Sequence, residues 1–233
     1  MAYYITLAVL LIFYVLAIPR INLLRNKKLT NGIFTAVIFA LYLAVIIRVY
    51  ISVGFDDWNF KNTLPVANVS PFMFTAVVVM HLLPRKIKKH CYLLICLLSV
   101  GMVLSAVFSC LYNAVINYSF HWHFLCDYLA HVLLSLWGVY LIKSSQVELN
   151  KKNAIISGAI IVGVAVFMLL LNVIFDTAFF GLSLNGKHSI YNVVLVKNSY
   201  LSAFLYFFGL LIVLVMGYVY SRLLSRKNKK TDL

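Results

Sequence analysis

Seven apolar stretches, each close to the length that crosses a lipid bilayer, take up most of this chain of 233 residues. A spanning α-helix needs about 20 mainly apolar residues. Hydrophobic residues make up 64% of the sequence and charged residues 11%, whereas a soluble domain is about half apolar and about a quarter charged. The composition therefore excludes a soluble protein and leaves no room in this chain for a second, water-soluble domain.

The spans predict an all-α fold, a single polytopic bundle of seven transmembrane helices. The first stretch has no basic segment before it and basic residues after it, which predicts a signal anchor with its N-terminus outside. An odd number of spans then places the C-terminus in the cytoplasm. The predicted spans cover residues 3–18, 32–54, 66–83, 91–117, 122–142, 153–175 and 200–221.

The basic residues support this orientation. The net charge is +14, and all but four of the 20 Lys and Arg residues fall in short segments that the orientation makes cytoplasmic, as the positive-inside rule expects. Such blocks meet the headgroups of membrane lipids, so we predict membrane lipids as partners and no nucleic acid. The segments hold Arg20, Arg25, Lys27, Lys28, Arg85, Lys86, Lys88, Lys89, Lys143, Lys151, Lys152, Arg222, Arg226, Lys227, Lys229 and Lys230.

The four cysteines carry no metal or disulfide signature. They lie within or beside apolar stretches and show no C-x-x-C spacing, which indicates neither a disulfide framework nor a structural zinc site. We predict small buried apolar side chains and assign no cofactor. The cysteines are Cys91, Cys96, Cys110 and Cys126.

A polar stripe runs along the fifth span. His123, Asp127 and His131 are spaced four residues apart, so they share one face of a helix and reach about 12 Å inward from the outer interface. Asp127 beside His131 suits a general base with a fixed tautomer. The same side chains could instead hold a metal such as zinc, form a hydrogen-bonded network between helices, or line a proton or ion path. These interpretations stay open.

Polar residues of other spans gather at the same outer side. The inner halves are mainly aliphatic and aromatic, with His81 as an interfacial exception. Because polar residues that only join helices would be scattered over both halves, this one-sided gathering predicts an outward-opening polar pocket. Its predicted members from other spans are Arg48, Asn68, Ser70, Asn113, Asn172 and Asp176.

Three segments carry a resemblance to a known family. They are Leu64-Pro65-Val66, the stripe that ends at His131, and the run from Asn172 to Phe180. In this order they resemble the YwaF family of bacterial seven-helix integral membrane proteins, which is similar to eukaryotic membrane acyltransferases and lipid hydrolases of the androgen-induced type. The resemblance implies a bacterial plasma membrane and a catalytic histidine at position 131.

The position of the family's cysteine differs here. The Leu-Pro segment of that family usually leads to a cysteine, and the eukaryotic relatives pair a Cys or Thr nucleophile with a histidine. Here the matching position holds Val69 between Asn68 and Ser70. The resemblance therefore carries over His131 but not the cysteine. The substitutes are Ser70, Thr63, Cys110 and Cys126, if one of them comes within reach of His131.

Two functions compete. The leading hypothesis is a membrane enzyme, an acyltransferase or hydrolase, that acts on a lipid acyl group from the outer leaflet. Its catalytic residues would be His131, Asp127 and Ser70, and its substrate-binding residues Arg48, Asn68, Asn113, His123, Asn172 and Asp176.

The alternative is a non-catalytic membrane protein. It would use the same pocket to bind a small molecule, a peptide or a partner membrane protein on the outer side. A transporter is less favoured, because the sequence shows no inverted repeat. The loop from Thr177 to Ser199 is either a lid or a surface loop.

Overall fold

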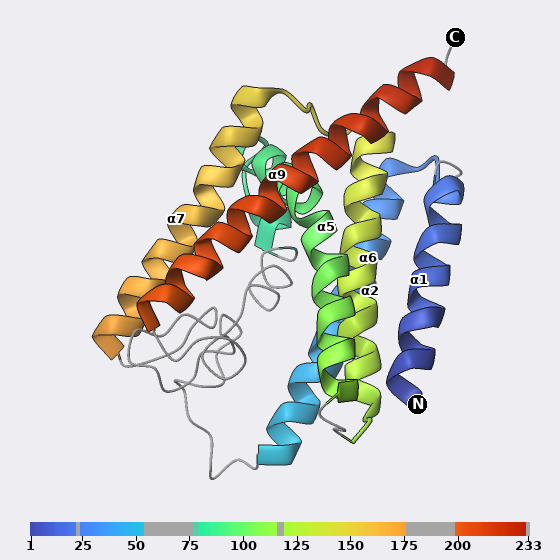
Figure 1. The fold of residues 1–233 in the computed structure, drawn as a ribbon. Coiled ribbons are helices and arrows are strands. Elements are labelled where there is room, and N and C mark those ends of the chain that lie inside the picture. The colour runs from blue at the N-terminus through green and yellow to red at the C-terminus, as the bar shows by residue number, and fades with distance from the viewer. Residues whose placement is uncertain (22–23, 54–76, 78, 116–118, 176–198, 232–233) are drawn as a thin grey trace.

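The computed structural model describes residues 1–21, 24–53, 77, 79–115, 119–175 and 199–231. All regular structure in these ranges is helical, as the sequence predicts (Figure 1). The elements are α1 (Ala2–Arg20), α2 (Lys27–Val53), the short 3-10 helix η2 (Met80–Leu82), α5 (Arg85–Val115), α6 (Trp122–Lys143), α7 (Lys151–Phe175) and α9 (Ser199–Thr231).

The six α-helices in the described ranges are each long and apolar enough to cross a membrane. They correspond to six of the seven predicted spans, with shifted ends. Helix α2 begins at Lys27 rather than at residue 32, and α9 continues to Thr231 rather than ending at 221. The predicted span 66–83 lies mostly outside the described residues, and its last residues form η2.

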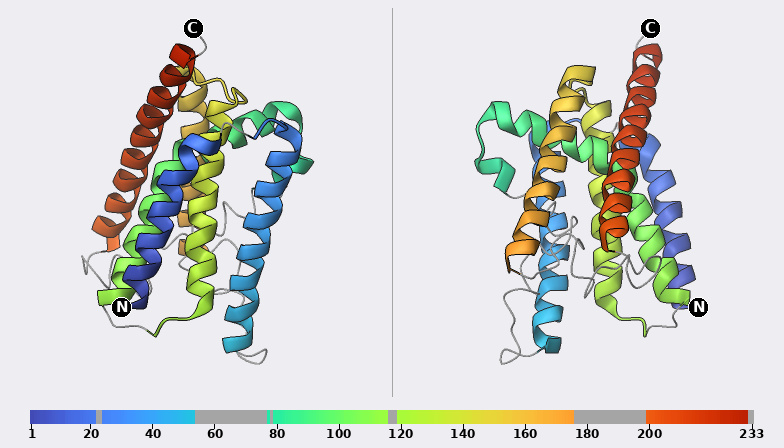
Figure 2. Two further views of the ribbon diagram at one scale, coloured as in Figure 1. Left: turned by 90° about the vertical axis from the view of Figure 1, so that its right-hand side faces the viewer. Right: turned by 60° about the vertical axis from the view of Figure 1, so that its left-hand side comes forward.

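Helix α6 is the central element of the bundle. It runs between α2 on one side and the pair α1 and α5 on the other, while α7 and α9 pack against α5 (Figures 1 and 2). Thirteen of its 22 residues are buried, all of them from Tyr128 onward. The most hydrophobic stretch of α6 is 72% buried, whereas that of α1 is 11% buried. Helix α6 therefore takes the interior position, and the other helices expose apolar faces that suit contact with lipid.

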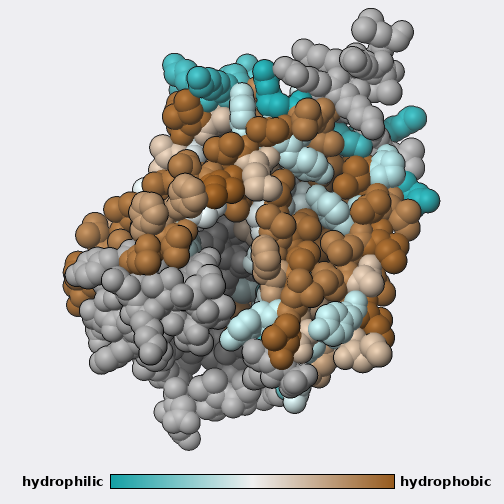
Figure 3. All heavy atoms as spheres, in the orientation of Figure 1, coloured by the Kyte–Doolittle hydropathy of each residue, from teal (hydrophilic) through white to brown (hydrophobic). Residues whose placement is uncertain are grey.

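Basic side chains gather at one end of the bundle, which we call the basic end. Helices α1, α6 and α9 finish there, and α2, α5 and α7 begin there (Figure 1). Figure 3 shows hydrophilic atoms along this end, above a broad belt of hydrophobic atoms. Its basic residues in the described ranges include Arg20, Lys27, Lys28, Lys86, Lys88, Lys89, Lys143, Lys151, Lys152 and Arg222.

Close backbone contacts hold α5 between α6 and α9. A Cβ atom added at Gly217 of α9 would overlap the backbone carbonyl of Leu97. One added at Gly138 of α6 would lie 3.0 Å from the Ile95 carbonyl oxygen. Small residues let membrane helices approach this closely, and the approach supplies the dispersion contacts that lipid cannot. One turn beyond Gly217, the Ser221 hydroxyl donates a hydrogen bond to the Cys96 carbonyl at 3.5 Å.

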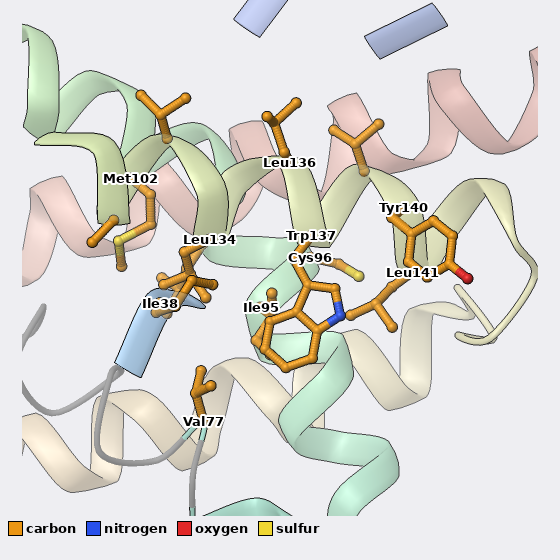
Figure 4. Close-up of a cluster of buried hydrophobic side chains, with 14 of the residues drawn as sticks. Ile38, Val77, Ile95, Cys96, Met102, Leu134, Leu136, Trp137, Tyr140 and Leu141 are labelled. Carbon is orange, nitrogen blue, oxygen red and sulfur yellow. The ribbon is translucent and has the colours of Figure 1, made fainter. Parts of the chain in front are cut away.

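Among the residues that the structure describes, the Trp137 indole is the largest fully buried side chain. Figure 4 shows it with Ile38 of α2 and with Ile95 and Cys96 of α5. Its ring stacks on Phe34 with centroids 6.0 Å apart. Because these neighbours come from two other helices, Trp137 fixes how α6 is rotated between α2 and α5.

Replacement of Gly217 by Ala tests the close crossing of α5 and α9. We expect a loss of about 1–3 kcal/mol in stability, because the new methyl group forces the two backbones apart. The measurement is thermal or denaturant unfolding of the purified protein in detergent. Gly209 of the same helix is the matched control, since an added Cβ there meets nothing within 4 Å. Gly209→Ala should leave stability unchanged or raise it by about 0.5–1 kcal/mol. Equal effects of the two substitutions would contradict this crossing.

Candidate functional site

His131 and Asp127 lie together as their spacing predicts, but the hydrogen bond of the imidazole is to the Asp127 backbone carbonyl rather than to its carboxylate. The His131 Nδ1 atom lies 2.8 Å from the Asp127 backbone oxygen and 3.6 Å from its carboxylate Oδ1. A carbonyl oxygen can only accept a hydrogen bond, so Nδ1 carries the proton. In the neutral ring the lone pair is then on Nε2. The local geometry therefore selects one tautomer, with Nε2 as the basic atom.

The two partners differ in how far they are exposed. His131 is 4% exposed, whereas the Asp127 side chain is 32% exposed. Gly138 follows His131 by about two helical turns and packs on α5, so His131 faces α5 as well. By the same periodicity His123 lies near the face of Trp137, which contacts α2. The polar stripe therefore passes from the α2 side of α6 to its α5 side.

Hydrogen bonds join the first turns of α6 to its neighbours. Asn113 of α5 donates to the Tyr128 hydroxyl at 2.8 Å. The Cys110 thiol donates to the Tyr3 carbonyl at 3.0 Å, and the Tyr3 hydroxyl donates to the Ser119 carbonyl at 3.2 Å. These bonds connect α1, α5 and the segment before α6 at the end opposite the basic end. Asn113, which the sequence predicts as a member of the site, thus contacts Tyr128, the residue that follows Asp127.

Some of the other predicted site residues lie in the described ranges and some do not. His123 lies in the first turn of α6, with its ring centroid 5.5 Å from that of His121. Asn172 is buried in α7 at 2% exposure, and Arg48 lies within α2. The remaining members lie outside the described residues, as does nearly all of the predicted loop from 177 to 199. These members are Asn68, Ser70 and Asp176.

The metal interpretation receives no support from the stripe itself. No group of three His, Cys, Asp or Glu side chains in the described ranges is arranged to hold a metal ion, and all three stripe residues are within those ranges. The four cysteines are free, with Cys96 and Cys110 buried. The general base, the structural network and the proton path stay open as interpretations of the stripe.

A second polar cluster, centred on Asn31, lies at the basic end. The Trp137 indole N–H donates to Asn31 Oδ1 at 2.9 Å, and Asn31 Nδ2 donates to Gln146 Oε1 at 2.7 Å. Asn31 is 7% exposed, so its amide is satisfied by protein partners on α6 and on the turn that follows it. We call this group, Asn31 with Trp137 and Gln146, the Asn31 network.

The turn after α6 delivers Gln146 to this network. Gln146 N–H donates to the Leu141 carbonyl at 3.0 Å and Ser145 N–H to the Ile142 carbonyl at 3.1 Å. With a φ of 53° at Ser145, this is the Schellman arrangement, in which a left-handed residue ends the helix. Gln146 Nε2 also donates to the Ser144 hydroxyl at 2.7 Å. The helix end therefore positions the partner of Asn31.

His81 joins η2 to α2. The Lys88 ammonium group, which can only donate, lies 3.4 Å from His81 Nδ1, so Nδ1 accepts and Nε2 carries the proton. Nε2–H then donates to the Thr35 hydroxyl at 2.8 Å, and Thr35 donates to the Asn31 carbonyl at 2.9 Å. The sequence predicts an interfacial histidine here. The side chain is exposed, and it is hydrogen-bonded on both nitrogens.

Sequence reasoning missed the Asn31 network because of one helix boundary. The predicted second span began at residue 32, which left Asn31 outside the membrane, whereas α2 begins at Lys27. The available signal was an amide in the first turn of an apolar span, where a side chain of this kind has to find a partner.

The fold defines the class of protein, an all-α protein whose six described long helices suit a membrane. No protein-family model, curated protein or solved structure matches the chain. Membership of the YwaF family therefore stays a prediction.

A double-mutant cycle tests the Asn31 network. Asn31→Ala leaves the Trp137 N–H and the Gln146 oxygen without their partner, which we expect to cost about 1–3 kcal/mol. Trp137→Phe removes the same indole hydrogen bond from the other side. The double variant should lose less than the sum of the two by about 0.5–1.5 kcal/mol, measured by unfolding in detergent. Strict additivity would show that the two side chains do not interact.

Proposed function

We propose that this protein is a multi-pass membrane enzyme that transfers or hydrolyses an acyl group of a lipid, with His131 as its general base. The observation that supports this most directly is the hydrogen bond from His131 Nδ1 to the Asp127 carbonyl, 2.8 Å long. It holds the ring in one orientation and places the lone pair of the neutral ring on Nε2, the atom that would accept the proton in general-base catalysis. The Asp127 carboxylate, 3.6 Å from Nδ1, would stabilise the imidazolium that forms.

In the proposed reaction the Ser70 hydroxyl attacks the ester carbonyl carbon while its proton moves to His131 Nε2. The alcohol of the lipid leaves with that proton. Water or a second alcohol then attacks the acyl carbonyl carbon, its proton passes to His131 Nε2 and from there to the Ser70 oxygen as that oxygen leaves. Arg48 or Asn68 would stabilise the oxyanion. Asn113, His123, Asn172 and Asp176 complete the proposed substrate site. Ser70 enters as a substitute for the family's cysteine, next to the matching position Val69, whereas His131 is supported by the resemblance and by its contact with Asp127.

The proposal includes a topology. Seven spans, the third at 66–83, would place the N-terminus outside and the C-terminus in the cytoplasm of a bacterial plasma membrane. The gathering of basic residues at one end of the bundle supports this orientation, since cytoplasmic segments carry the excess of Lys and Arg. Asp127, near the opposite end, would then face the outer leaflet.

A non-catalytic protein is the second candidate, favoured by the burial of His131. At 4% exposure, with a hydrogen bond inside its own helix, His131 also fits a structural role in helix packing. In that case the polar residues of the outer half would bind a small molecule, a peptide or a partner membrane protein without turnover.

Replacement of His131 separates the two candidates. We expect His131→Ala to lower turnover by about 10²–10⁴-fold, because the proton acceptor is lost. The assay uses the purified protein in nanodiscs of phosphatidylethanolamine and phosphatidylglycerol with isotope-labelled acyl chains. Mass spectrometry then follows released fatty acid and acyl transfer to added lysolipid.

His81→Ala is the matched control, since His81 lies at the basic end, away from His131. It should retain turnover, and Asp127→Asn should lose less than His131→Ala. A folded His131→Ala protein with full turnover would refute the catalytic role. A wild-type protein without turnover that binds a small molecule or peptide through His131 would favour the second candidate.

A further inference from the structure

Basic side chains surround the link between α6 and α7. Lys89 Nζ lies 3.1 Å from Glu148 Oε2. The Arg222 guanidinium of α9 donates to the Leu149 carbonyl at 3.3 Å. Lys151 and Lys152 follow at once as the first two residues of α7. Three helices therefore bring four cations to one short link, and we call these four residues the link patch.

The positive charge of the link patch is poorly balanced. Glu148 is the acidic residue of this link, and it is paired with Lys89. The hydrogen bond from Lys89 holds the pKa of Glu148 below its usual value, so the carboxylate stays charged and offsets one cation. Lys151, Lys152 and Arg222 are exposed and make no ion pair with any residue in the described ranges. A net positive surface of three charges remains.

Helix stability does not account for the lysines of α7. The N-terminal end of a helix carries a partial positive charge, so acidic residues stabilise it and cations do not. The first turn of α7 holds no acidic residue and begins with Lys151 and Lys152. The charges therefore suit an anion from outside the chain.

Exposed apolar side chains adjoin the patch on the membrane side. Ile155, one turn after Lys151 in α7, is 61% exposed, and Val219, about one turn before Arg222 in α9, is 50% exposed. Figure 3 shows the hydrophobic belt that begins directly below the basic end. A ligand that fills both regions has an anionic head and apolar chains, which is the chemistry of an anionic phospholipid.

We propose that the link patch binds the headgroup of an anionic phospholipid, with the acyl chains against the neighbouring apolar surface of α7 and α9. This site lies at the end opposite to Asp127, so it is independent of the activity proposed for His131.

The experiment measures lipid retention by the full chain. The purified protein in detergent is titrated with dioleoyl-phosphatidylglycerol or dioleoyl-phosphatidylcholine, and bound lipid is counted by native mass spectrometry. We expect the anionic lipid to be retained at concentrations about tenfold lower than the zwitterionic lipid. The triple variant Lys151→Gln, Lys152→Gln, Arg222→Gln should lose this preference. The conservative variant Lys151→Arg, Lys152→Arg, Arg222→Lys should keep it, which separates charge from folding.

The matched control removes three charges elsewhere at the basic end. Arg25, just before α2, and Lys27 and Lys28, its first two residues, are exposed, and their replacement by Gln should leave the preference intact. Equal loss in both triple variants would overturn the proposal in favour of diffuse surface charge. Equal retention of the two lipids would overturn it too. Tighter binding of poly-glutamate than of the lipid at the link patch would assign the surface to an acidic protein partner instead.

Discussion

Helices in a bilayer gain nothing from excluding water when they meet, because lipid tails are as apolar as their side chains. Their association depends on how closely the backbones approach. In the described part of this chain the closest approaches lie on the two sides of α5. Gly217 presses α9 against Leu97, and Gly138 presses α6 against Ile95. Larger side chains at either position would keep the helices apart. The remaining features depend on the placement of α6 that this double contact produces.

The two ends of α6 then differ in the contacts that they make. At the basic end Trp137 and Gln146 are bonded to Asn31, so the helix can neither rotate nor slide without breaking buried hydrogen bonds. Because α6 is a rigid helix, fixing its rotation at the basic end also fixes the direction of His131, which faces α5. The histidine is oriented within its own helix by Asp127. A firmly held structural end thus fixes the direction of a side chain with one defined basic nitrogen.

Local signals in the sequence predicted the local features well. Span length and hydropathy located six helices to within a few residues at most ends, and a spacing of four predicted the contact of Asp127 with His131. The Asn31 network was missed for two reasons: the predicted span began one residue after Asn31, and Asn31 is separated from Trp137 by 106 positions and from Gln146 by 115. Periodicity says which face a residue is on, but not which distant residue packs against it. Asn68, Ser70 and Asp176 lie outside the described residues, so their part in the site stays a prediction.

The turn after α6 has a consequence for the engineering of this protein. Ser145 adopts a backbone conformation that β-branched residues avoid, and the next residue must reach Asn31 on α2. Insertion of a reporter or epitope between Ser144 and Gln146 would therefore alter the spacing that docks α2 onto α6, even though the segment is a short surface link. Sites for such additions are better sought where no side chain of the connection has a partner deep in the bundle.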